Sequence, residues 1–390
     1  MKEHDVASAI DPHLPLSITE ELIRIPSYQA GEMEANLIAY IKGRFEKRDI
    51  PYRVIQRDGV DIGIIGKIGE GPRSLMFHSH IDTVPPANIE QWDNDPFTPV
   101  QSGGKLYGLG ACDDKGSLGA MLAAFETLAE RRSELGGTLI MAAVGAEERG
   151  GLGTQTLVAE EERAEAVVLG EPTMAEPKIG HKGVLRLEII TNGVSAHAST
   201  PKEGVNAISH MAALIPGLDE LAEKVALKTE QYTGQASMAV TTIQGGTALN
   251  VIPSSCSISI DRRLVPGEGE HEATEAVHRV IRECKKRIPE LNTEVKRVRC
   301  VPAALTEPES PIVSMALEIA GDELEKRLGP AGFSACCDMA YLKQAGMPVV
   351  ILGPGDVGMA HKMNEYVDIA SLSAAANIYA RIASRWSAGK

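Results

Sequence analysis

Acidic and histidine side chains, each inside a short phrase, are spread over almost 300 residues of this chain. They are His80 and Asp82 in HSHID, Asp113 in YGLGACDDKG, Glu147 and Glu148 in VGAEERGG, Glu171 in LGEPT, and His361 in MAHKMNE. Five nitrogen and oxygen ligands with two further carboxylates suit a pair of divalent cations of the zinc type. They also suit chemistry in which a metal-bound water attacks a carbonyl carbon. The set therefore predicts a two-metal hydrolase.

Most of these phrases lie at the ends of predicted strands. The strands are expected at 61–68, 74–82, 138–145 and 166–171, with a helix at 117–132. Alternating strands and helices indicate an α/β fold, in which helices cover both faces of a mostly parallel central sheet. Ligands of such sheets bind beyond the carboxyl ends of the strands. We therefore expect the acidic and histidine side chains to converge at one edge of the sheet.

A different order of elements begins near residue 182. It runs strand, helix, strand, strand, helix, strand, at 184–191, 205–225, 237–244, 255–263, 272–287 and 292–299. This βαββαβ order is the ferredoxin-like, split βαβ arrangement. We therefore predict three segments: the first part of the catalytic domain at 1–180, an inserted ferredoxin-like domain at 181–300, and the second part of the catalytic domain at 301–390.

Bulk composition excludes several classes of protein. A chain of 390 residues is too long for one hydrophobic core, so two domains are expected. The net charge of −14 disfavours nucleic acid and anionic membranes as partners, and no apolar run approaches the roughly 20 residues that span a bilayer. The start of the chain lacks the layout of a signal peptide. Six cysteines without CxxC spacing indicate buried free thiols in a reducing compartment, and hence a cytoplasmic protein.

Each phrase taken alone has a structural explanation as well. His80 and Asp82 could be a hydrogen-bonded pair of the core. Of Asp113 and Asp114, which precede a helix, one is expected to cap it while the other points inward. Two adjacent glutamates could be a solvated pair. The joint occurrence of these phrases in this order has no such explanation, and it favours the metal site.

The sequence resembles a known family of metallopeptidases and amidohydrolases. This family includes acetylornithine deacetylase, succinyl-diaminopimelate desuccinylase, aminoacylase and the glutamate carboxypeptidases. The resemblance runs from about residue 15 to 385 and includes the linking phrases WDNDPFTP (92–99), SAHASTP (195–201), GGTALNVIP (245–253) and DRR (261–263).

The resemblance implies a role for each residue of the metal site. His80 and Glu171 would bind the first metal, Asp82 would orient that site, Asp113 would bridge both metals, Glu148 and His361 would bind the second, and Glu147 would be the general base. The metals would be two Zn²⁺ per chain, with Co²⁺ or Mn²⁺ as alternatives. A non-proline cis peptide bond would join Asp113 to Asp114.

The resemblance also implies roles for the inserted domain, as a lid and as the contact of a homodimer. His197 in SAHASTP would stabilise the oxyanion, often in the site of a neighbouring subunit. Asn250 and Arg263 would contact the carboxylate of the substrate, with Arg262 as the competing candidate. An arginine suits a carboxylate because its fork binds both oxygens.

The substrate implied is a small molecule, an N-acyl amino acid or a dipeptide with a free carboxylate. A deacetylase is favoured by HKG at 181–183, which is more like that branch than the desuccinylase branch. Two departures weaken the transfer of a named substrate: Asp114 stands where relatives have a hydrophobic residue, and Cys336 and Cys337 precede Asp338 where relatives often have Thr-Asp. The alternatives are a dipeptidase or carboxypeptidase and, more distantly, a homologue that binds metal without turnover.

Overall fold

The computed structural model describes residues 9–389, which form two compact units. Unit 1 consists of Met1–Gly180 and Leu305–Lys390, and unit 2 of His181–Ala304. Residues 1–8, part of the segment on which the absence of a signal peptide is predicted, lie outside the described residues. Within the described part of the chain, no helix has both the length and the apolar character needed to cross a membrane.

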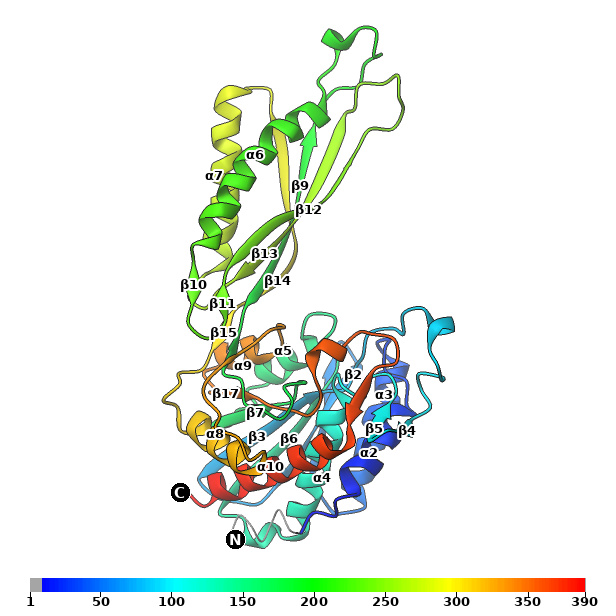
Figure 1. Cartoon of the computed structure of the whole chain (residues 1–390), viewed down its shortest axis with the longest axis vertical. Coiled ribbons are helices and arrows are strands. Elements are labelled where there is room, and N and C mark those ends of the chain that lie inside the picture. Colours follow the sequence, from blue (N-terminus) through cyan, green and yellow to red (C-terminus); the bar gives the residue numbers. More distant parts are fainter. Residues whose placement is uncertain (1–8, 390) are drawn as a thin grey trace. The chain divides into compact units, whose positions relative to one another are not determined.

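The centre of unit 1 is a six-stranded sheet with the order β1-β2-β6-β3-β7-β17 (Figure 1). The strands are β1 (Tyr52–Arg57), β2 (Val60–Ile68), β3 (Arg73–His80), β6 (Gly137–Val144), β7 (Ala166–Leu169) and β17 (Val349–Ile351). Neighbours from β6 to β17 run parallel, whereas β2 is antiparallel to both β1 and β6. The α/β fold is therefore confirmed, and the mostly parallel sheet carries an antiparallel hairpin at one edge.

Helices cover both faces of this sheet (Figure 1). They are α2 (Leu14–Ile23), α3 (Glu32–Glu46), α4 (Lys115–Glu130), α5 (Leu152–Ala159), α8 (Pro311–Glu323), α9 (Met339–Gln344) and α10 (Ile369–Ser387). Helices α4 and α10 pack on β3 and β6, whereas α5 packs on β1 and β2 and against α9. Almost every side chain of α4 is buried, because the sheet, α2 and α10 all pack against it.

A small three-stranded sheet of unit 1 holds two loops of the site together. Its strands are β4 (Val100–Ser102), β5 (Lys105–Tyr107) and β18 (Tyr366–Asp368), in the order β18-β5-β4. Strand β5 is antiparallel to β18, with Tyr107 opposite Tyr366. The first residues of the loop after β5 therefore lie beside the last residues of the loop before β18. The remaining short strands are β8 (Gly180–His181), β15 (Ala304–Leu305) and β16 (Gly332–Phe333).

Unit 2 is an antiparallel sheet of four long strands with two helices. In chain order the elements are β9 (Gly183–Asn192), α6 (Ala207–Ala226), a short hairpin of β10 (Thr229–Glu230) and β11 (Gly234–Gln235), β12 (Ser237–Gly245), β13 (Ser255–Leu264), α7 (Glu270–Arg287) and β14 (Asn292–Val301). The strand order β12-β13-β9-β14 is that of a ferredoxin-like unit. Leu185, Leu187 and Ile189 alternate with polar residues along β9 and form a core with the two helices, as the period of two requires.

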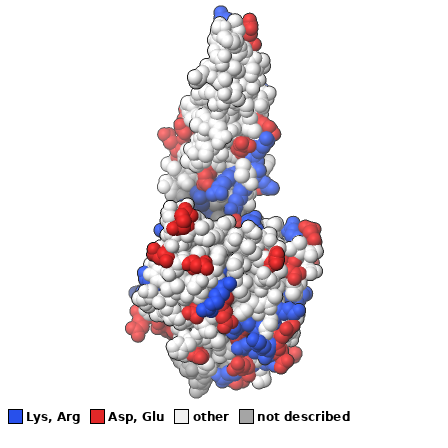
Figure 2. All heavy atoms as spheres, turned by 90° about the vertical axis from the view of Figure 1, so that its right-hand side faces the viewer, with Lys and Arg blue, Asp and Glu red and all other residues white. Residues whose placement is uncertain are grey.

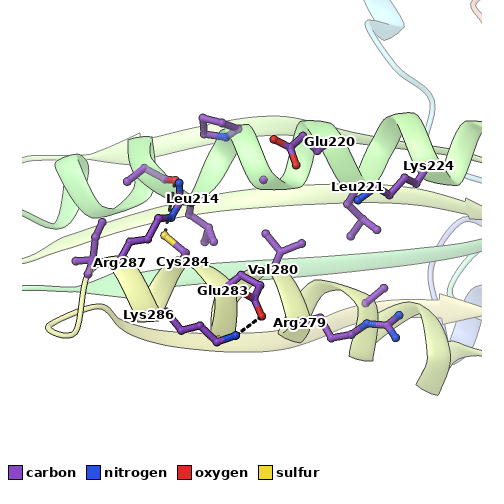
Figure 3. Close-up of a pocket in the computed structure, with 15 residues that line it drawn as sticks. Leu214, Glu220, Leu221, Lys224, Arg279, Val280, Glu283, Cys284, Lys286 and Arg287 are labelled. Atoms are coloured by element: carbon purple, nitrogen blue, oxygen red, sulfur yellow. Dashed lines mark hydrogen bonds and ion pairs between the residues drawn. The ribbon is translucent and has the colours of Figure 1, made fainter.

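The surface of unit 2 differs between its helical side and its sheet. A groove of about 1040 Å³ runs between α6 and α7, lined by Leu214, Leu221 and Val280 (Figure 3). Glu283 and Lys286 form an ion pair of 2.7 Å at its rim. On the face drawn in Figure 2, Lys and Arg side chains gather over the lower part of unit 2, whereas both signs of charge are scattered over unit 1. The groove contains none of the candidate metal ligands.

The six cysteines are free, as the sequence predicts. Four of them, including Cys112 and Cys337, are buried. Burial raises the pKa of both of these thiols, so that neither is a thiolate at neutral pH.

Candidate metal centre

Four of the candidate metal ligands of unit 1, together with the candidate base Glu147, lie where the parallel strands of its central sheet end. His80 is the last residue of β3, Glu147 and Glu148 lie in the turn after β6, and Glu171 follows β7. His361 lies in the loop between β17 and β18. Because these strands point the same way, their carboxyl ends meet at one edge. The predicted convergence of these side chains at one edge of the sheet is therefore present.

Asp113 belongs to two groups of side chains that could each hold a metal ion. The first group is His80, Asp113 and Glu171, and the second is Asp113, Glu148 and His361. The ligand atoms of each group lie within 4.8 Å of one another. Asp113 Oδ1 is 3.1 Å from His80 Nε2, and its other oxygen, Oδ2, is 3.4 Å from His361 Nε2. One oxygen of Asp113 thus faces each group.

The hydrogen bonds of His80 leave the correct nitrogen available for a metal. Its Nδ1 lies 2.8 Å from the backbone carbonyl oxygen of Asp82, an acceptor that requires the proton on Nδ1. The lone pair then stays on Nε2, which faces Asp113. A metal-binding histidine usually donates its other nitrogen in this way, because the hydrogen bond fixes both tautomer and ring orientation.

The carboxylate of Asp82 binds the turn that carries Glu147 and Glu148. It is fully buried and accepts hydrogen bonds from the backbone N–H groups of Glu147 and Glu148, at 3.0 and 3.2 Å. Its Oδ1 is 3.6 Å from His80 Nδ1, which is beyond a hydrogen bond. Asp82 therefore fixes the turn that carries two glutamates of the site, and its backbone, rather than its side chain, holds His80.

Glu147 stands apart from both groups of ligands, whereas its neighbour Glu148 hydrogen-bonds His361 Nε2 at 2.8 Å. Burial raises the pKa of the Glu147 carboxyl well above its usual value, and the nearby Asp338 raises it further. Burial also raises the pKa of Glu171, with a further contribution from Asp113. Both shifts have the same cause: burial and neighbouring carboxylates disfavour the charged form of each carboxyl group.

The donor set fits divalent cations. Within residues 9–389, no ion pair joins Asp113, Glu148 or Glu171 to a lysine or arginine, and the ion-pair partners of Asp113 and Glu148 are histidines. Hydrogen bonds to Asp113 and Glu148 raise the pKa of His361 to about 10. Divalent cations would favour the charged carboxylates and the neutral imidazoles that ligation requires. Imidazole nitrogen and carboxylate oxygen are ligands that zinc accepts.

The predicted cis peptide bond between Asp113 and Asp114 is present. Asp114 immediately precedes α4, but its side chain makes no capping hydrogen bond. Its Oδ2 instead accepts a hydrogen bond of 2.5 Å from the hydroxyl of Ser79, away from the metal ligands. Asp114 thus occupies the N-cap position of α4, but the expectation that an aspartate side chain caps the helix is wrong, because this carboxylate is bound to the buried Ser79 hydroxyl.

Glu365 is a residue of the site that the sequence did not single out. Its carboxylate is buried and accepts three backbone N–H groups of the loop that ends at Asp113. The pKa of Glu365 is raised to about 7, mainly by burial. The three N–H donors act in the opposite direction and keep it from rising further. The signal was its place four residues after His361 in MAHKMNE, but a single acidic residue in a loop does not reveal its partners.

The three remaining predicted residues lie in unit 2, in two separate places. His197 is exposed, and its Nδ1 lies 2.7 Å from Ser199 Oγ. The backbone carbonyl of Asn250 accepts the Ala198 N–H at 2.9 Å, so the loops of His197 and Asn250 are adjacent. Both loops lie beyond Ser255, the first residue of β13, where His197 pairs with Val251.

Arg263 lies at the other end of the same strand, eight residues from Ser255. At about 3.3 Å per residue, this separation is roughly 26 Å. Its Nε donates to Asp261 Oδ1 at 2.8 Å, and it remains about one-third exposed. Arg262, the competing candidate, is buried and bound to Glu268 and to the carbonyl of Ala273, because alternate residues of β13 face the helices. Of the two arginines, Arg263 is thus the exposed one, and Arg262 is bound inside unit 2.

Cys337 lies close to the metal ligands. Burial raises the pKa of its thiol, and the carboxylates of Glu171 and Glu147 are near enough to add to the shift. The next residue, Asp338, accepts a hydrogen bond from Thr154, whose hydroxyl is 2.8 Å from His78 Nε2. Of the pair Cys336 and Cys337, it is therefore Cys337 that lies next to the site.

Comparison with known proteins agrees with this geometry. The profile of peptidase family M20/M25/M40 matches residues 76–385. The chain is 32% identical to acetylornithine deacetylase of Proteus mirabilis (strain HI4320) over 320 residues, which are 79% of this chain and 78% of that protein. The fold is similar to an M20 family metallo-carboxypeptidase from Sulfolobus solfataricus, with a TM-score of 0.80 at 19% identity over 96% of this chain and 99% of the other. It is also similar to a dinuclear metal binding peptidase of the M20 family from Bacillus subtilis, with a TM-score of 0.73 at 19% identity over 95% and 97%.

Proposed function

Because this chain belongs to peptidase family M20/M25/M40 and is a metal-dependent hydrolase of amide bonds, we propose that it removes the acyl group from an N-acyl amino acid. The observation that carries this proposal is the pair of ligand groups that share Asp113, with the separate carboxylate of Glu147 in the next turn. The likeness to acetylornithine deacetylase supports an acylated amino acid over a peptide.

Two zinc ions would occupy the centre. His80, Asp113 and Glu171 would hold one, and Asp113, Glu148 and His361 the other. Such ions supply Lewis-acid polarisation of the amide carbonyl and a lowered pKa for the attacking water.

The side chains of unit 1 would carry the proton transfers. Glu147 takes a proton from the water while the water oxygen bonds to the carbonyl carbon of the amide. When the carbon–nitrogen bond then breaks, the same carboxyl gives that proton to the leaving amine. Burial suits this role, because it raises the pKa of the Glu147 carboxyl and so makes it a stronger acceptor for the proton of the water. Asp82 holds the turn that carries Glu147.

In unit 2, His197 would stabilise the oxyanion, and Arg263 with Asn250 would bind the substrate carboxylate. His197 and Asn250 lie in adjacent loops beyond the Ser255 end of β13, whereas Arg263 lies near its other end, and the strand from Ser255 to Arg263 alone is roughly 26 Å long. A small substrate cannot touch both Arg263 and this pair of the same chain. If all three act on one substrate, Arg263 belongs to one chain and His197 with Asn250 to the other. This separation supports a homodimer through unit 2, in which His197 works in trans.

Mixing two inactive variants tests the action in trans. Subunits with His197→Ala and subunits with Glu147→Gln should regain part of the activity when exchanged into mixed dimers. In each mixed dimer, one site then has both an intact Glu147 and the His197 of the other chain. Hydrolysis is measured before and after exchange, with each variant alone as the control. Mixed dimers without activity would place His197 in its own chain's site, and light scattering that shows only a 41.6 kDa species would contradict the dimer.

The experiment that tests the function itself has two steps on one sample. Elemental analysis should find close to two metal ions per chain, and a screen for amine release should find hydrolysis of one class among N-acetyl, N-succinyl and N-formyl amino acids. Release from dipeptides alone would favour the alternative, a dipeptidase or carboxypeptidase. Two metals without any release would favour a homologue that binds metal without turnover. A chain that takes up no metal under any condition would disprove the proposal.

A further inference from the structure

Glu365 makes an unusual set of contacts for a loop residue. It is 1% exposed, and both of its carboxylate oxygens accept backbone N–H groups. Oε2 accepts from Gly110 at 3.0 Å, and Oε1 accepts from Cys112 at 2.8 Å and Asp113 at 2.9 Å. These donors line the last four residues before the cis peptide bond. One buried carboxylate therefore sets the backbone path that leads to the shared ligand.

The pairing of β5 with β18 brings Glu365 to this loop. Glu365 immediately precedes β18, and the loop begins directly after Tyr107 of β5. The backbone continues the pairing by one step, since the Gly108 N–H donates to the carbonyl of Glu365 at 3.1 Å. The side chain then reaches further along the same loop. The contact is thus built into the register of the small sheet.

The segment that carries Glu365 also carries His361. Asn364, between them, is fixed to Asp93: its side-chain oxygen accepts the Asp93 N–H at 2.9 Å, and its amide donates to Asp93 Oδ2 at 3.0 Å. Asp113 and His361 both belong to the second group of ligands, with Glu148. The first group contains Asp113 but no residue of the His361 segment. Glu365 therefore joins two of the three ligands of one group and one ligand of the other.

We propose that Glu365 is a positioning residue that holds Asp113 and His361 in register, so that the second metal site depends on it more than the first. This inference rests on the proposed function, because it assumes that both groups bind metal. Glutamine cannot replace the carboxylate. Its oxygen can accept two N–H groups, but its NH₂ group then faces the third donor, and a buried N–H loses its acceptor.

Glu365→Gln tests the proposal through metal binding rather than activity. The metal-free proteins are titrated with Co²⁺ by calorimetry, and magnetic coupling between the two ions is followed by electron paramagnetic resonance. Wild type should bind two ions and show coupling through Asp113. In the variant, the second ion should bind about 10- to 100-fold more weakly, the scale seen when a residue behind a ligand is lost. The first ion should bind nearly as before. When Co²⁺ is added at one equivalent more than the first site needs, the magnetic coupling between the two ions, which wild type shows, should be absent from the variant.

A matched control separates positioning from stability. Glu126 is also 1% exposed and lies in unit 1, but its carboxylate binds Arg44 and Arg48 rather than the site. Glu126→Gln should lower the melting temperature and leave both Co²⁺ affinities unchanged. Second-site binding by Glu365→Gln that is no weaker than in Glu126→Gln would overturn the proposal. A wild type that binds fewer than two ions would instead contradict the proposed function.

A shorter acid provides a second variant in case Glu365→Gln does not fold. Glu365→Asp keeps the charge and both acceptor oxygens but shortens the side chain by one methylene, so it reaches fewer of the three N–H groups. We expect weaker binding of the second ion and unchanged binding of the first. If the affinities for both ions fell equally, or if neither fell, a selective role for Glu365 would be contradicted.

Discussion

Glutamine in place of Glu147 should leave both metal ions bound and slow amide hydrolysis at least about 100-fold, the usual contribution of a positioned base. Glu147 belongs to neither group of ligands, so its loss removes no ligand. The amide of glutamine has nearly the shape of the carboxyl but cannot take a proton from water. The expected loss therefore lies in kcat, and metal content by elemental analysis should match that of wild type.

The adjacent residue provides the matched comparison for this test. Glu148 has the same side chain and follows Glu147 in the same turn, and Asp82 holds the backbone N–H of both. Glu148 differs in that it faces His361. Glu148→Gln should therefore lose metal as well as activity. Near-normal turnover of Glu147→Gln would remove Glu147 from the role of base, and loss of metal from this variant would make it a ligand.

The sequence predicted the position of the site because that position depends on local pattern. The segments 74–82 and 138–145 each contain an apolar run, LMF and LIMAAV, and a ligand phrase comes directly after each run. In a parallel sheet this order alone brings the strand ends together. The cis peptide bond after Asp113 followed from the resemblance, not from the local pattern.

Contacts between distant segments could not be predicted in this way. Glu365 reaches backbone N–H groups more than 250 residues earlier, through the pairing of two strands of only three residues each. Such short strands, β5 and β18, have no readable period. The sequence also gave no reason for Asp82 to bind the turn of Glu147, because its partner is backbone, whose position depends on the whole sheet. For the same reason Asp114, expected as a possible cap, binds Ser79 instead.

Asp113 is the residue on which both proposed metal sites depend. Its two oxygens face different histidines, at 3.1 Å and 3.4 Å, whereas each of the other ligands belongs to one group only. Three backbone contacts with Glu365 fix the loop that presents it. Loss of a ligand such as Glu171 would therefore affect one ion, whereas a change at Asp113 should affect both and the coupling between them.

Asp113→Asn should lower hydrolysis by about 10³-fold, because metal catalysis contributes several kcal/mol and about 4 kcal/mol corresponds to this factor. An amide oxygen carries no charge, and its NH₂ group would face one of the two ions, so metal content should fall as well. Asp114→Asn is the matched control, since Asp114 is the next residue and equally an aspartate but hydrogen-bonds Ser79. It should keep both ions and most of the activity. If Asp113→Asn instead kept two ions with wild-type affinity, the two groups would not share a ligand, and the chain's metal sites would be independent.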